Sequence, residues 1–269
     1  MRLDVTDPRT IETAFLIPGA PLKIIIHGYT GNKTYTPNME LRPAYFRNPR
    51  EVNIITVDYG QLALDGCYLQ AIQNMDLVAM CTAQFLDVFF EIRQDVAVRD
   101  MHVVAFSLGC HIAGQIKNYF QHGVIERITG MDPAAPFLYE PFISDDKILN
   151  KGDAKFVDAI HTNCGFKGKC IPRADVDFYA NNVSTQPGCG QNNSCSHARA
   201  VEFYAESINS PIGFWASLCT PCTTLLRSCN DNSPNWNLFG EYTNLKACGI
   251  YYFITNDHPS YALGFTGNE

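Results

Sequence analysis

Ser107 stands in a segment, Met101–Gln115 (MHVVAFSLGCHIAGQ), that could supply an activated nucleophile. A hydrophobic run leads into the serine, and a segment of helical character follows it. Two small residues, Ala105 and Gly109, flank the serine at a spacing of two positions. A tight turn from strand to helix needs small residues there because backbones crowd, and a helix N-terminus favours developing negative charge. The segment predicts a nucleophile elbow in which Ala105 replaces the usual first glycine.

A serine hydroxyl is a poor nucleophile unless a histidine removes its proton and a carboxylate orients that histidine. Asp132 follows the next hydrophobic run, in ITGMDPAAPF, which fits the order serine, acid, histidine of α/β-hydrolases. Downstream, His161 ends the run KFVDAIH, and His197 lies in CSHARAVEF. A position in a cysteine-tied loop that opens a helix suits His197 as the base, and His161 is expected to shape the site, but the residues alone leave this choice open. We expect His27 to be structural and His258 to lie at the surface.

The tetrahedral intermediate of acyl transfer needs two backbone N–H donors for its oxyanion. The N–H of Leu108, directly after the nucleophile, is one candidate. The second donor is expected in the loop His27-Gly28-Tyr29, after the first hydrophobic run. Gly28 would let this loop approach closely. We assign the second donor to Tyr29.

Hydrophobic runs that alternate with helical periodicity must position these residues. We expect strands over 22–27, 52–59, 101–106, 127–132, 155–161 and 249–255, and helices over 70–94, 110–120 and 197–208. This alternation predicts an α/β fold with a mostly parallel central sheet and helices on both faces. No linker divides the chain, so we expect one catalytic domain over 1–269. The stretch from Cys164 to Cys195 is rich in Gly, Asn, Pro and Cys and is expected to be loops.

The 11 cysteines indicate an oxidising compartment. Disulfides are favoured over metal because Cys219-x-x-Cys222 has no second ligand pair, and no metal or cofactor is expected. An odd number leaves at least one thiol free or bonded outside the chain, and Cys110, behind the elbow, is the expected free thiol. Glycosylation motifs at Asn32, Asn182 and Asn192 agree with a secreted glycoprotein.

The charge and the termini narrow the function classes further. A net charge of −7 argues against a nucleic-acid partner, and no run of apolar residues is long enough to span a membrane. Met1–Thr10 lacks the apolar core of a signal peptide. We therefore expect either that a signal has been removed or that the numbering begins inside a longer precursor.

Nine motifs in order carry a family resemblance: HGYTGN, AFSLGCHIAGQ, ITGMDPAAPF, FVDAIHT, VDFYANN, QPGCG, CSHARAVEFYAESI, GFWASLC and GIYYFITN. Over about residues 20–265 they resemble the catalytic domain of the animal pancreatic-lipase family, and most of all its insect members. The resemblance implies an α/β-hydrolase fold and oxyanion donors at Tyr29 and Leu108. It places the catalytic triad on Ser107, Asp132 and His197, which decides the choice of histidine.

The chain also departs from the family pattern. Besides Ala105, Tyr59 stands where a Trp is usual, and Cys110 replaces an Ala. Vertebrate members hold calcium with acidic residues before the FVD strand. The corresponding stretch here, LNKGD over 149–153, carries Asn150 and Lys151, so no tight calcium site is expected. Members with a C-terminal lipid-binding β-sandwich continue past the position of Glu269, so that domain is expected to be absent.

A lid closed by a disulfide precedes the catalytic histidine in this family, and the resemblance implies that Cys189 and Cys195 form it. The five residues between these cysteines are small or polar and are too few for an amphipathic helix over an apolar cleft. A second compact loop over 163–173 is expected to be pinned by Cys164 and Cys170.

In the family, very short lids accompany phospholipase A1 or galactolipase activity. The resemblance therefore implies a secreted esterase that releases the sn-1 chain from phospholipid or galactolipid at a membrane or micelle surface. The alternatives are a triacylglycerol lipase or general carboxylesterase, and a catalytically silent lipid-binding or yolk-type storage protein. Storage relatives lack the serine, whereas here all triad positions are filled. The headgroup, the oligomeric state and the pairing of six cysteines stay open: Cys67, Cys81, Cys219, Cys222, Cys229 and Cys248.

Overall fold

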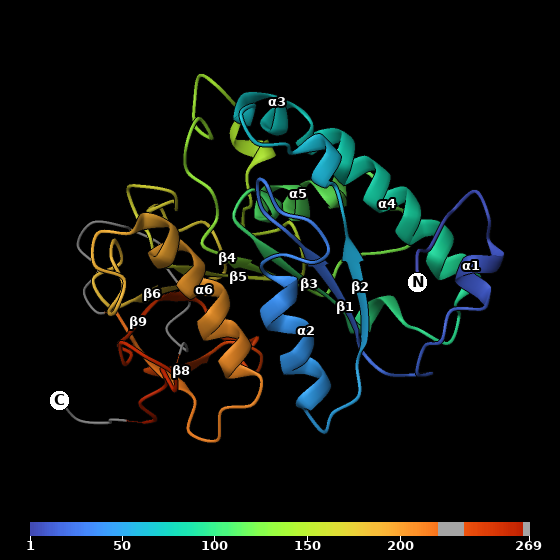
Figure 1. The fold of residues 1–269 in the computed structure, drawn as a ribbon. Helices are drawn as coiled ribbons and strands as arrows, with labels where there is room; N and C mark the ends of the chain where they lie inside the picture. The colour runs from blue at the N-terminus through green and yellow to red at the C-terminus, as the bar shows by residue number, and fades with distance from the viewer. Residues whose placement is uncertain (220–233, 266–269) are drawn as a thin grey trace.

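The computed structural model describes residues 1–219 and 234–265. In these residues nine strands form one sheet in the order β2-β1-β3-β4-β5-β6-β9-β7-β8 (Figure 1). The strands from β2 to β9 in this order are parallel, and β7 pairs antiparallel with β9 and β8. Their bounds are β1 Leu22–Ile26, β2 Asn53–Val57, β3 Met101–Phe106, β4 Arg127–Met131, β5 Phe156–His161, β6 Val176–Ala180, β7 Phe214–Leu218, β8 Trp236–Phe239 and β9 Gly249–Phe253.

Helices cover both faces of this sheet, which confirms the expected α/β-hydrolase fold. On one face, α4 and α5 join a hydrophobic cluster with the central strands, and on the other, α2 and α6 form a second cluster. The α-helices are α1 Arg9–Glu12, α2 Asn38–Arg47, α3 Tyr68–Gln73, α4 Met75–Ile92, α5 Leu108–Gln115 and α6 Asn193–Ser207. Short 3-10 turns are η1 Gly60–Leu62, η2 Val98–Asp100, η3 Ile116–Asn118 and η4 Asp145–Lys147.

The central strands are buried from end to end, as parallel strands covered on both faces must be, and this explains their continuous apolar runs. Their register aligns the carboxyl ends, with Ile26 beside Ala105 and Phe106 beside Met131. The residues that follow β1, β3, β4 and β5 therefore gather at one edge of the sheet. Ligand sites of open α/β sheets form at this edge.

Two expectations about the elements were wrong. The segment 70–94 forms two helices, which meet at Asn74, and the Asn74 side chain donates to the Leu62 carbonyl oxygen (2.9 Å). The stretch from Cys164 to Cys195 is not all loops, since it contains β6 and the start of α6. Strand β6 is hard to recognise in the sequence because Asp177 interrupts its apolar pattern. In the structure this carboxylate is buried and pairs with His161.

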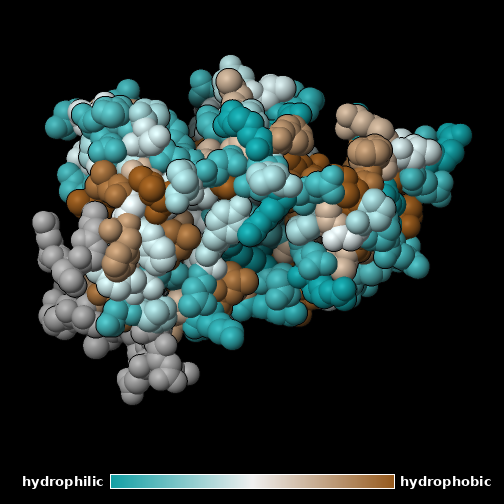
Figure 2. All heavy atoms as spheres, turned by 90° about the horizontal axis from the view of Figure 1, so that it is seen from below, coloured by the Kyte–Doolittle hydropathy of each residue, from teal (hydrophilic) through white to brown (hydrophobic). Residues whose placement is uncertain are grey.

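The surface seen from below carries hydrophobic residues in several groups that hydrophilic residues separate (Figure 2). In the part of the chain that the structure describes, no helix combines the length and the hydropathy needed to cross a membrane.

Candidate active site

Ser107 occupies the sharp turn between β3 and α5 with φ 54° and ψ −121°. Its N–H donates to the Met131 carbonyl oxygen (3.0 Å), and its own carbonyl accepts from the Ala134 N–H (3.2 Å). The turn is crowded, because a Cβ at Gly28 would lie 2.8 Å from the Ser107 Cβ, and a Cβ at Gly109 only 2.4 Å from a backbone oxygen. A non-glycine residue at positive φ stores backbone strain that the surroundings must hold. This geometry has the form of the predicted elbow.

The departures at positions 105 and 110 lie together behind this turn. Ala105 is fully buried and pairs across β3 and β4 with Gly130. The Cys110 thiol donates to the Ala105 carbonyl oxygen (3.2 Å). Cys110 is buried and free of disulfides, as expected, and burial raises the pKa of its thiol. The thiol therefore stays protonated and unreactive in the folded chain.

Asp132 directly follows β4, at φ 46°, and its carboxylate is fully buried. One carboxylate oxygen, Oδ1, accepts N–H groups from Thr162 (2.8 Å) and Asn163 (3.2 Å), just beyond β5. The other oxygen, Oδ2, accepts from Nδ1 of His197 (2.5 Å). Gly168 packs so closely on this carboxylate that a Cβ there would lie 2.3 Å from Oδ1. The acid is thus fixed on every side and holds one tautomer of His197.

His197 lies near the start of α6, with its ring centroid 4.6 Å from that of Phe106. Ser107 and His197 line the same cavity, of about 470 Å³. The structure therefore brings together the three residues that the sequence singles out: the serine from the end of β3, the acid from the end of β4 and the histidine from α6.

Two backbone N–H groups next to the serine are unpaired. Neither Leu108 nor Tyr29 donates its N–H to an acceptor within residues 1–219 and 234–265. The Tyr29 loop is held in place, because its phenolic oxygen accepts from the Cys67 N–H (3.0 Å) and its ring contacts Tyr68 edge-on at 4.9 Å. Unpaired donors at the start of α5 suit an oxyanion, since the helix N-terminus adds its partial positive charge.

The family model described as Lipase matches residues 2–229 of this chain. The chain belongs to the lipase family. It is 35% identical over 170 residues to "Phospholipase A1 member A" of Rattus norvegicus, which is 62% of this chain and 35% of that protein. Identity is 32% over 168 residues to the Homo sapiens protein of the same name (62% and 35%) and 33% over 138 residues to "Lipase member H" of Oryctolagus cuniculus (51% and 29%). The chain spans about a third of the length of these curated relatives.

His161, the other histidine that the sequence brought forward, lies apart from the residues that line this lipase-family cavity. Its Nε2 is 2.9 Å from Asp177 Oδ1, and its Nδ1 is 2.8 Å from the Lys169 carbonyl oxygen. Burial alone would lower its pKa, but the hydrogen bond and charge of Asp177 outweigh burial and raise the pKa above 6.5. With both ring nitrogens facing acceptors, His161 ties β5 to β6.

The remaining histidines named from the sequence lie where expected. His27 is fully buried and stacks on Tyr59 with ring centroids 4.1 Å apart, and the Tyr59 hydroxyl donates to the His27 carbonyl oxygen (2.7 Å). Tyr59, which replaces the usual Trp, thus supports the loop that carries Tyr29. His258 is exposed beside Asp257.

In the stretch over 149–153, other side chains already bind the oxygen atoms that could serve as calcium ligands. Asp153 pairs with the Lys117 ammonium at 2.6 Å, and the Asn150 side-chain oxygen accepts from Arg173 (3.1 Å). Lys151 pairs with Asp175 at 2.9 Å. In the described residues, no group of three or more His, Cys, Asp or Glu side chains could hold a metal ion. These residues do not fit calcium, because protein cations already bind the oxygens that it would need.

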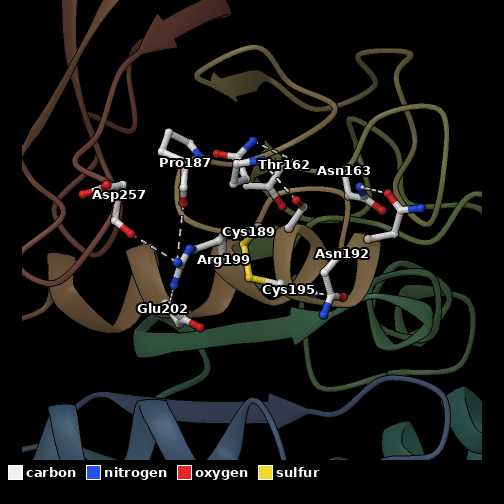
Figure 3. The surroundings of a disulfide bond; sticks show 12 residues. Thr162, Asn163, Pro187, Cys189, Asn192, Cys195, Arg199, Glu202 and Asp257 are labelled. Atoms are coloured by element: carbon white, nitrogen blue, oxygen red, sulfur yellow. Dashed lines mark hydrogen bonds and ion pairs between the residues drawn. A yellow bond between two sulfur atoms is a disulfide. The ribbon is translucent and has the colours of Figure 1, made fainter.

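Both expected disulfides are present, Cys164–Cys170 and Cys189–Cys195. Figure 3 shows the second bond against the start of α6, with Asn192 beside it. The Asn192 side chain accepts the Cys195 N–H (3.0 Å) and so caps α6 next to His197. The short lid is therefore a capped turn.

Further along α6, Arg199 points from the helix toward the Pro187 and Asp257 carbonyl oxygens (Figure 3). This arrangement fixes the helix that carries His197 to two surface loops. Among the remaining cysteines, Cys219 and Cys248 are disulfide-bonded. Cys67 and Cys81 are exposed and free, and Cys222 and Cys229 lie outside the described residues.

Sequence reasoning missed the residues that hold the acid. Thr162 and Asn163 bind Asp132 through backbone N–H groups, which carry no signal in residue type. Gly168, which packs on the carboxylate, lies in a loop where a glycine reads as an ordinary turn residue. The usable signal was the position of Thr162 and Asn163, since they directly follow β5 and the carboxyl ends of neighbouring parallel strands meet.

Proposed function

We propose that this chain is a secreted serine esterase, a phospholipase A1 that releases the sn-1 acyl chain of a phospholipid or galactolipid. The observation that carries the proposal is the strained Ser107 in one cavity with His197, whose Nδ1 is bound by the buried Asp132. A cysteine-rich secreted glycoprotein with one catalytic domain agrees with the disulfides at Cys164 and Cys189.

Each residue has one task in the proposed reaction. His197 takes the proton of the Ser107 hydroxyl through Nε2 while the serine oxygen attacks the ester carbonyl carbon. The oxyanion of the tetrahedral intermediate accepts the Tyr29 and Leu108 N–H groups. The protonated histidine then gives its proton to the departing glycerol oxygen, which leaves an acyl group on Ser107. Water, with His197 as its base, releases the fatty acid, and Asp132 stays ionised throughout to stabilise the imidazolium.

The short lid supports a polar lipid rather than triacylglycerol. Between Cys189 and Cys195 the chain makes a capped turn, so no amphipathic helix from this loop covers the cavity. Substrate entry then needs no lid opening at an oil surface. Similarity to relatives named phospholipase A1 member A points to the same class of substrate.

Of the alternative functions, two use the same ester-hydrolysis chemistry and one has no catalytic activity. A triacylglycerol lipase or general carboxylesterase would use the same three residues and differ only in substrate. A silent lipid-binding or storage protein is disfavoured, because it has no need for a strained serine beside an acid-bound histidine.

The experiment is a substrate panel of phosphatidylcholine, galactolipid, trioleate and p-nitrophenyl butyrate, run beside Ser107→Ala. We expect phosphatidylcholine or galactolipid to turn over faster than trioleate, a smooth rise of rate with substrate, and loss of several orders of magnitude in the variant. An organophosphate should label Ser107. A trioleate rate far above the others would identify a lipase, and no turnover of any ester would support the binding protein.

A further inference from the structure

Lys167 places an ammonium group at the cavity. Of the described residues that line it, Lys167 alone is an Asp, Glu, Lys or Arg. The other lining side chains are aromatic, small or hydroxylic, apart from the catalytic histidine. An isolated cation in an otherwise uncharged cavity favours a substrate that carries a negatively charged group.

The backbone of Lys167 is held firmly. Its N–H donates to the Asn163 side-chain oxygen (3.0 Å), and its carbonyl accepts from the Ala135 N–H (2.8 Å). The adjacent Gly168 rests on the carboxylate of Asp132. The loop that carries the cation is therefore built onto the catalytic acid, and the lysine emerges at a fixed place relative to the reacting groups.

The ammonium is held at the cavity mouth but is not neutralised. It donates to the Ser194 hydroxyl (2.7 Å) on the short lid loop, and the nearby Asn163 amide, labelled in Figure 3, donates to the Asn193 side-chain oxygen (3.1 Å). No carboxylate lies within ion-pair distance of Lys167 in the described residues. An ammonium has three N–H donors, so at least one stays available to an acceptor from outside.

We propose that Lys167 binds the phosphate of the substrate headgroup while Ser107 attacks the sn-1 ester. This inference rests on the proposed function and narrows it, because it selects phospholipid over galactolipid. In a phospholipid only the glycerol backbone separates the sn-1 ester from the phosphate, so one cavity can hold both groups. A charge-assisted hydrogen bond to phosphate stabilises binding more than a neutral one. The net charge of −7 repels anionic lipids at long range, so a zwitterionic phospholipid fits best.

Lys33 offers a matched control for Lys167. It is also an exposed lysine, and it neighbours Thr30, Gly31 and Tyr35 of the cavity lining, but it pairs with Asp58 at 3.2 Å. Lys167→Met and Lys33→Met change the net charge equally. Any difference between them then reflects the local contact and not the overall field of the protein.

The experiment measures kcat and KM of both variants for phosphatidylcholine in neutral detergent micelles and for p-nitrophenyl butyrate. Lys167→Met should raise KM for phosphatidylcholine roughly tenfold, since an exposed ionic hydrogen bond contributes toward the low end of its range, and its loss on phosphatidylcholine should far exceed its loss on butyrate. Lys167→Arg should retain most of the affinity for phosphatidylcholine. High salt should raise the KM of the wild type toward that of Lys167→Met. Equal effects of Lys167→Met and Lys33→Met, or equal losses on both substrates, would overturn the inference.

A second measurement separates failure of the inference from failure of the proposed function. A diether analogue of phosphatidylcholine, which has no ester, should compete with p-nitrophenyl butyrate for wild type. The inhibition constant should rise about tenfold in Lys167→Met. If the analogue inhibits both proteins equally, Lys167 does not bind phosphate. If phosphatidylcholine is bound but not hydrolysed, the proposed activity is wrong while the phosphate site stands.

Discussion

Gly168→Ala tests whether the loop beside the acid sets the catalytic rate. A Cβ at this position would lie 2.3 Å from Oδ1 and 2.4 Å from Oδ2 of Asp132. Atoms in contact need about 3.5 Å, so either the carboxylate or the loop must retreat by about 1 Å. Backbone hydrogen bonds from Gly168 and Ala135 hold the loop, so the carboxylate must take part of the displacement despite its own hydrogen bonds.

The rate effect follows from this displacement. A shift of about 1 Å in a catalytic group costs on the order of 10²-fold in rate. Complete loss of the acid from a serine–histidine pair costs on the order of 10⁴-fold, which sets the upper limit. We expect kcat of Gly168→Ala to fall by about 10²- to 10⁴-fold, with KM little changed.

The assay is p-nitrophenyl butyrate hydrolysis together with a thermal melt. Gly165→Ala is the control, because Gly165 lies in the same disulfide loop at φ 82° with open space around its Cβ position. That variant strains the backbone by about 1–2 kcal/mol and should lower the melting temperature without a loss of kcat comparable to that of Gly168→Ala. A folded Gly168→Ala with wild-type kcat would refute the argument that Asp132 orients His197.

Three further predictions concern other residues. His197→Ala should lose about as much activity as Ser107→Ala, because triad members act as a unit, whereas His161→Gln should keep measurable turnover; the reverse ranking would identify the wrong histidine. The Cys110 thiol should react with a thiol reagent only as the protein unfolds, which mass mapping under native and denaturing conditions can check, since it is fully buried. The folded pKa of His161 lies above 6.5, so its stabilisation is complete below pH 6.5 and is lost as pH rises through the folded pKa, by up to about 1.4 kcal/mol per pH unit. Urea unfolding at pH 6 and pH 9 should show this loss in wild type and a smaller loss in His161→Gln, and equal losses would show that His161 is neutral in the fold.

The central strands and the turn at Ser107 could be predicted from the sequence because these features depend on local pattern. Four of the six expected strands are buried from end to end, which requires apolar runs, and the elbow needs small residues at fixed positions around Ser107. Strand β6, which lies inside the sheet between β5 and β9, was harder to predict. In β6 the buried Asp177 breaks the apolar pattern, and only its pairing with His161 explains why a carboxylate is tolerated there.

Tertiary contacts explain the rest of what the sequence could not supply. The unpaired N–H groups of Tyr29 and Leu108 are backbone features, so no residue type encodes them. The contact of Lys167 with Ser194 joins two loops far apart in the chain, and each loop alone reads as ordinary polar surface. The hydrogen bond of His197 to Asp132 could be named only by analogy with relatives, since nothing in the residues fixes which histidine reaches the acid.

The left-handed backbone at Ser107 and Asp132 has an evolutionary consequence. Each residue holds a positive φ that costs of order 1–3 kcal/mol and that glycine would adopt without strain. At Asp132, glycine would leave the buried N–H groups of Thr162 and Asn163 without their acceptor, so the relief of strain is offset there. At Ser107, glycine would remove the proposed chemistry and relieve strain at the same time, so selection for turnover is what keeps the serine in place. A lineage without that selection could lose catalytic activity and gain folding stability in one substitution. This is a short path from an esterase to a stable lipid-binding protein.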